Sequence, residues 1–137
     1  MAGLASSTGQ WPEAVHPRTG GGCMGDGQHI WAASDWVLMM RSWFVREEED
    51  RLILASGIPR DWTRNGKTSE FGPAPTPWGP VTVRVRGEAD GAVVEWSGRW
   101  RGEQPVLEVR LPGYRPATPD PGSGGVRLAA TAEEPIA

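Results

Sequence analysis

A loop near the N-terminus, residues 8–29, gathers the side chains that could do chemistry in this chain. It reads TGQWPEAVHPRTGGGCMGDGQH and is rich in glycine. Glu13 follows Trp11 and Pro12 on a turn that proline makes rigid, so its carboxylate could serve as a general base that activates water for attack on a sugar carbon. Alternatively, Glu13 is an ordinary loop glutamate that is exposed to solvent, because the sequence fits both interpretations. Trp11 either offers a flat face for a pyranose ring or packs beneath the loop.

The same loop contains residues of the types found in two other kinds of site. His16 and His29, with Cys23 and Asp26, have the atoms of a metal site, but their spacings fit no established zinc pattern. The run GGGCMGDG lacks the Gly-Lys-Ser/Thr ending of a phosphate loop, and Asp26 would repel an anion. We therefore expect no metal and no cofactor.

The loop leads into a segment with helical periodicity. Asp26 could cap a helix over residues 28–45, and one face of it would be apolar, with residues at spacings of three and four: Ile30, Ala33, Val37, Met40 and Phe44. Tryptophan and methionine side chains widen this face beyond half of the circumference. Such a helix needs packing partners on several sides.

Beyond the acidic run at 47–50 the pattern becomes strand-like. Val81, Val83 and Val85 alternate with polar residues, the EADG sequence at 88–91 indicates a hairpin turn, and apolar residues alternate again after it. Residues 106–111 form a further candidate strand. The sequence thus predicts an α+β fragment, with one long apolar helix followed by a small antiparallel β-sheet or sandwich.

Three segments are expected. Residues 1–46 would hold the loop at 8–29 and the helix at 28–45, residues 47–112 an antiparallel β-domain, and residues 113–137 a Pro/Gly-rich tail with one possible edge strand at 126–130.

Composition narrows the range of partners. The net charge is −3 and the arginines are scattered, so neither nucleic acid nor an anionic membrane surface is an expected partner. The single cysteine cannot form an internal disulfide. No signal peptide is visible, and the most apolar run is too short and polar to span a bilayer. A cytoplasmic protein is expected.

Two stretches of the sequence carry a resemblance to a known family. TGQWPEAVHPRTGGGCMGDGQHIWAASDWVLMM, followed by FVREEEDRLILASGIPRDW, resembles the C-terminal part of bacterial six-hairpin glycosidase-like proteins. Those proteins have an (α/α)6 toroid followed by a small β-domain, and the resemblance makes the predicted helix the last of the toroid. It implies that Glu13 is the general base of an inverting glycoside hydrolase. It also implies a sugar pocket lined by Trp11, His16, Arg18, Asp26 and His29.

The chain departs from this family in what it lacks. An inverting enzyme needs two carboxyl groups about 6.5–9.5 Å apart, and only Glu13 can be nominated. Twelve helices would need roughly 135 residues in helix alone. We therefore expect this chain to be a C-terminal fragment of such an enzyme. It would be inactive without the missing N-terminal toroid, which would belong to the same or to another chain. Two alternatives stay open: a non-catalytic carbohydrate-binding or structural β-module, and an interaction module whose helix docks onto a partner.

Overall fold

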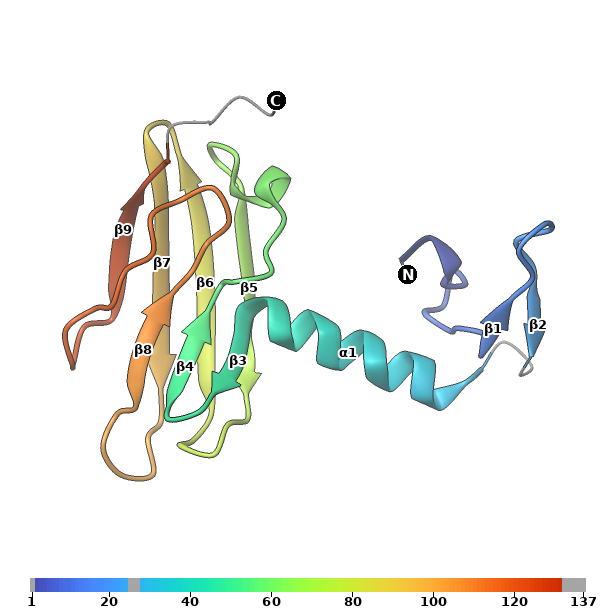
Figure 1. The fold of residues 1–137 in the computed structure, drawn as a ribbon, viewed down its shortest axis with the longest axis horizontal. Helices are drawn as coiled ribbons and strands as arrows, with labels where there is room; N and C mark the ends of the chain where they lie inside the picture. The colour runs from blue at the N-terminus through green and yellow to red at the C-terminus, as the bar shows by residue number, and fades with distance from the viewer. Residues whose placement is uncertain (1, 25–27, 132–137) are drawn as a thin grey trace. The chain divides into compact units, whose positions relative to one another are not determined.

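The computed structural model describes residues 2–24 and 28–131, which divide into two compact units at residues 40 and 41. The described residues contain one α-helix and nine β-strands in three sheets (Figure 1). The protein is therefore mostly β, and the predicted α+β fragment with a long apolar helix is wrong.

The helix differs from the prediction in length and in burial. Helix α1 spans Ile30–Phe44, 15 residues, of which Phe44 is buried. Four large apolar side chains remain exposed on it: Ile30, Trp31, Val37 and Leu38. The helical period was real, but the expected packing on several sides is not present in the described residues. This α-helix is also neither long enough nor apolar enough to cross a lipid bilayer.

Strand pairing ends the helix at Phe44. Strand β3 (Val45–Glu48) begins at once and pairs antiparallel with β4 (Arg51–Leu54), with Val45 opposite Leu54. Glu49 lies in the tight turn between them and has a φ of 53°. The acidic run thus forms the end of a strand and a hairpin turn, and Leu52, the partner of Glu47 in the register, is buried in the core.

The first unit, residues 1–40, is small. It contains the 3-10 helix η1 (Ala2–Leu4), a short hairpin of β1 (Ala14–Val15) and β2 (Gly22–Met24), and most of α1. Trp11 is buried and packs against Trp36 of α1, with ring centroids 5.5 Å apart.

The second unit, residues 41–137, is a sandwich of two sheets. One sheet has the order β3-β4-β8, in which β8 (Val106–Val109) runs parallel to β4. The other is antiparallel, with the order β5-β6-β7-β9, and its strands are β5 (Thr68–Ala74), β6 (Val81–Glu88), β7 (Gly91–Gly98) and β9 (Gly125–Ala129). The 3-10 helix η2 (Arg60–Thr63) lies between β4 and β5 in the sequence.

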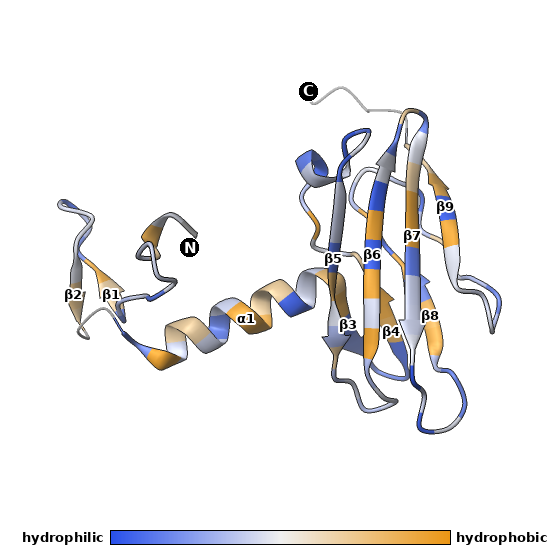
Figure 2. Ribbon diagram, turned by 180° about the vertical axis from the view of Figure 1, so that it is seen from behind, coloured by the Kyte–Doolittle hydropathy of each residue, from blue (hydrophilic) through white to orange (hydrophobic). Residues whose placement is uncertain are grey.

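Apolar and polar residues alternate along the strands, and the apolar side chains fill the space between the two sheets. Along β6, Val81, Val83 and Val85 are fully buried, while Arg84 and Arg86, which follow Val83 and Val85, are exposed. Figure 2 shows the resulting apolar and polar bands on β6. Leucine and valine side chains of β4 and β8 join the same hydrophobic cluster, so one core holds the sandwich together.

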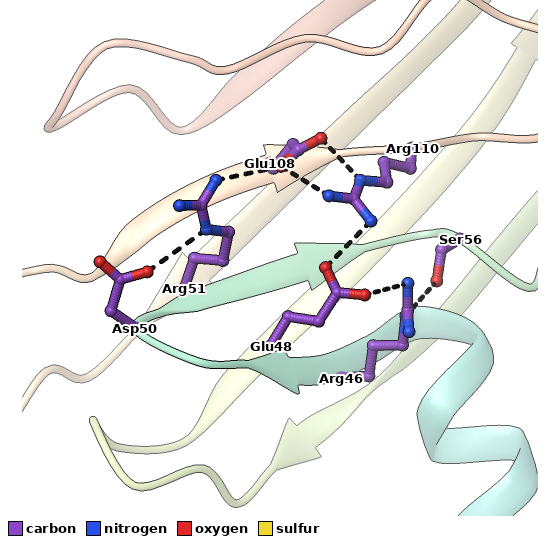
Figure 3. A network of polar contacts seen from close by, with 7 residues as sticks. All are labelled: Arg46, Glu48, Asp50, Arg51, Ser56, Glu108 and Arg110. Carbon is purple, nitrogen blue, oxygen red and sulfur yellow. Dashed lines mark hydrogen bonds and ion pairs between the residues drawn. The ribbon is translucent and has the colours of Figure 1, made fainter.

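The outer face of the β3-β4-β8 sheet carries a network of ion pairs (Figure 3). Arg110 donates to both oxygens of Glu108 and to Glu48, and Glu48 also pairs with Arg46. Ile53 lies on this outer face, opposite Arg46 and Glu108 in the strand register, yet it has no exposed surface. The aliphatic stems of the charged side chains therefore cover it.

Candidate functional site

The backbone fixes Glu13 at the base of the β1-β2 hairpin. Its N–H donates to the carbonyl oxygen of Met24 at 3.0 Å, which extends the pairing by one residue. The side chain is about half exposed, at 47%. The carboxylate is thus carried on a positioned backbone but remains open to solvent or to a ligand.

His29 caps the start of α1 and faces Glu13. Its carbonyl oxygen accepts from the N–H of Ala33, and its Nδ1 accepts from the N–H of Ala32 at 3.4 Å, as the side chain of an N-cap residue does. Because Nδ1 accepts a hydrogen bond, the neutral ring carries its proton on Nε2. That nitrogen lies 3.8 Å from Oε2 of Glu13. The cap therefore directs an N–H towards the carboxylate.

Trp11 lies two residues before Glu13 in the sequence and is hydrogen-bonded to His29. Its carbonyl oxygen accepts the main-chain N–H of His29 at 2.8 Å, and its ring is only 8% exposed. The ring packs against Trp36 and leaves little surface for a sugar. Trp11 therefore positions His29 through its main chain, and little of its ring is left to line a pocket.

The hairpin keeps His16 and Arg18 away from Glu13. His16 follows β1, and its Nδ1 accepts the N–H groups of Arg18 and Thr19, each at 3.3 Å, within the turn that leads to β2. The two residues of β1, Ala14 and Val15, lie between Glu13 and His16, so an extended chain would place them about 10 Å apart. Arg18 lies exposed in that turn. Of the expected pocket residues, the structure brings Trp11 and His29 to Glu13; Asp26 lies outside the described residues.

The described residues show no group of three or more histidine, cysteine, aspartate or glutamate side chains that could hold a metal ion. Cys23 is a free thiol, exposed on β2.

A second candidate site lies on the outer face of the β5-β6-β7 sheet and was not predicted. It is a groove of about 410 Å³, lined by Glu70, Thr82, Arg84, Glu95, Trp96, Ser97 and Gly124. Arg84 donates from Nε to Glu70 at 2.6 Å across the β5-β6 pair. The alternation of residues 81–86 placed Arg84 on an outer face, but the register that sets Glu70 and Glu95 on either side of it is tertiary information.

The two candidate sites differ in chemistry. At the first, an imidazole N–H faces a carboxylate, so the pair can bind a hydroxyl group or water between a donor and an acceptor. The groove offers two hydroxyl groups, two carboxylates and a guanidinium, which suits hydrogen bonding to a polar ligand. In comparisons with protein-family models, with curated proteins and with solved structures, the chain shows no significant match.

Proposed function

We propose that this chain is the C-terminal part of a glycoside hydrolase and that Glu13 is the general base of its active site. The observation that carries the proposal is the pairing of Glu13 with His29, whose Nε2 lies 3.8 Å from the carboxylate. An ionised carboxylate only accepts hydrogen bonds, so it can take a proton from water once a sugar is bound. The resemblance of residues 8–40 and 44–62 to six-hairpin glycosidase-like proteins supports the same assignment.

In this mechanism Glu13 activates water on one face of the sugar ring, and a carboxylic acid on the other face protonates the leaving oxygen. The anomeric configuration is inverted because the water attacks directly. The second carboxyl group comes from a segment outside these 137 residues or from another chain. On its own, the chain is therefore expected to be inactive.

The test is Glu13→Gln in the protein that carries this segment together with its complementing part. Glutamine keeps the shape of the side chain but cannot take the proton. Loss of a general base lowers the rate by about 10²–10⁴-fold, so we expect kcat to fall in that range while sugar affinity is kept. Glu103→Gln, at an exposed loop position, is the matched control. An unchanged kcat for Glu13→Gln would refute the assignment, and retention of configuration, measured by NMR of the first product, would refute the inverting mechanism.

The groove on the outer face of the β5-β6-β7 sheet supports a second candidate function, a carbohydrate-binding module. Its hydroxyl, carboxylate and guanidinium groups match the hydrogen-bonding groups of an oligosaccharide. Titration calorimetry of the full chain against a panel of oligosaccharides tests this. We expect one glycan to bind and Arg84→Gln to weaken it about tenfold, while Arg101→Gln, in an exposed loop, leaves the affinity unchanged. Flat titrations throughout would exclude the module.

A further inference from the structure

The exposed side of α1 carries one narrow apolar stripe, which the exposed Asp35 borders. Ile30, Trp31, Val37 and Leu38 are exposed by 76%, 74%, 58% and 57%. At about 100° per residue, these four side chains and Ser34 fall within about 120° of the helix circumference. The opposite side, with Ala32, Ala33, Trp36, Met39 and Met40, is partly buried. The stripe contains no charged residue over its two turns.

The stripe is symmetric about its own centre. Ser34 lies midway along it, with Ile30 and Leu38 four residues away on either side and Trp31 and Val37 three residues away. Ser34 also lies at the middle of the stripe around the helix circumference. A two-fold axis beside Ser34 therefore places apolar residues on apolar residues at both ends.

We propose that, where the complementing part of the proposed hydrolase is absent, two copies of this chain associate through antiparallel contact of their α1 helices, crossing at Ser34. At each end of the contact, Ile30 and Trp31 of one copy pack with Val37 and Leu38 of the second copy. The two Ser34 side chains meet at the centre, where a small residue lets the helices approach closely, within the 8–10 Å between axes that helix pairs adopt. The contact is isologous, as expected for a two-fold dimer.

The size of the stripe sets the strength of the dimer. The four apolar side chains on each copy give an interface of about 1,000 Å² in total, in the range of weak and transient complexes. The dimer should therefore exchange with monomer as the protein concentration changes. Aromatic and aliphatic side chains with few charges are the composition expected at the centre of such an interface.

Sedimentation equilibrium over a hundredfold range of concentration tests the dimer. We expect the full chain to shift from monomer to dimer, and Leu38→Lys to shift the midpoint to at least tenfold higher concentration, because two lysines would enter the apolar layers. Leu38 is exposed, so the variant should keep the wild-type circular dichroism spectrum. Val106→Lys, at another exposed apolar position on β8, is the matched control and should dimerise normally. A chain that stays monomeric throughout, or a dimer insensitive to Leu38→Lys, overturns the proposal.

Cross-linking tests the crossing point. In a Cys23→Ser background, which removes the chain's one cysteine, Ser34→Cys should give a disulfide-linked dimer under mild oxidation, because position 34 meets its own copy. Leu38→Cys should not, since the two copies of position 38 lie eight residues apart along the antiparallel pair, about 12 Å. A parallel pair would cross-link at both positions. Efficient cross-linking at 38, or none at 34, overturns the antiparallel crossing.

Discussion

Arg41, in the last turn of α1, donates two parallel hydrogen bonds to the carboxylate of Glu47 on β3. Its Nη1 lies 2.6 Å from Oε2, and its Nη2 donates to Oε1. The same Nη2 donates to the carbonyl oxygen of Pro75, just after β5, at 2.7 Å. A single guanidinium thus ties the end of the helix to both sheets of the sandwich.

The Arg41–Glu47 pair should make stability depend on pH in the acid range. The hydrogen bonds from Arg41 hold the pKa of Glu47 below its ordinary value of 4.5. A depressed folded-state pKa contributes stability that is fully present above the unfolded pKa and is lost as the pH falls through the folded pKa. We therefore expect the free energy of unfolding to decrease below about pH 4.5, measured by urea denaturation between pH 7 and pH 3.

Glu47→Gln isolates this contribution. Charge-assisted hydrogen bonds contribute about 1.5–3 kcal/mol, so at pH 7 we expect the variant to lose about 1–2 kcal/mol, because the pair is partly exposed. Its stability should then fall less steeply with acid than that of the wild type. Glu103→Gln is the control. Parallel pH profiles for wild type and Glu47→Gln would show that this pair does not cause the acid sensitivity.

Arg110 is expected to stabilise the β3-β4-β8 sheet in two ways. It bridges Glu108 on β8 and Glu48 on β3, so it crosses above the middle strand, β4. Its hydrogen bonds hold the pKa of Glu108 below its usual value. Without the guanidinium the two carboxylates would repel each other, and without the stem Ile53 would be less well covered.

Two substitutions separate these effects. Arg110→Met keeps an apolar stem, whereas Arg110→Ala removes it as well. We expect the melting temperature to decrease from wild type to Arg110→Met and again to Arg110→Ala. In 1 M salt the first difference should shrink, because the ion pairs are screened, while the second remains. Equal melting temperatures for the two variants would mean that the stem does not protect Ile53.

Gly87 on β6 allows the backbone after η2 to lie directly on the sheet. A Cβ atom at this position would come within 2.2 Å of the carbonyl oxygens of both Thr63 and Arg64. Backbone atoms cannot yield as a flexible side chain can, so Gly87→Ala should lose about 2–3 kcal/mol of stability. Gly102→Ala, where no atom lies within 4 Å of the added Cβ, is the control and should be nearly neutral. Denaturant titration of both variants checks this.

The strands of the second unit show how far the sequence could predict the fold. Val81, Val83 and Val85 alternate so regularly that β6 could be predicted, and the EADG turn could be placed between β6 and β7. The parallel pairing of β4 with β8 could not be predicted, because more than fifty residues separate Leu52 from its partner Leu107. Such register depends on the packing of the whole core.

The helix and the loop show what the sequence could not predict. The apolar periodicity of α1 predicts a buried helix, but periodicity records which residues are apolar and not what covers them. In the loop, Glu13 and His29 were both nominated from the sequence, yet their proximity depends on His29 capping α1, for which Asp26 had been expected. The sequence could supply the candidate residues, while the hairpin decides which of them meet.

His29 is expected to have two separable roles, one for each ring nitrogen. Nδ1 caps α1, and Nε2 faces Glu13. Asparagine is a good N-cap residue but cannot reach Glu13 in the same way, so His29→Asn should keep helicity and stability while changing any activity that depends on Glu13. His29→Ala should lose both the helix cap and the contact with Glu13, and the missing cap should lower the free energy of unfolding by about 1 kcal/mol. Circular dichroism and urea denaturation report on the cap, and hydrolysis by the complemented protein reports on the Glu13 contact. If His29→Ala is as stable as the wild type, the cap is not formed through Nδ1, and the argument that Nε2 carries the proton fails with it.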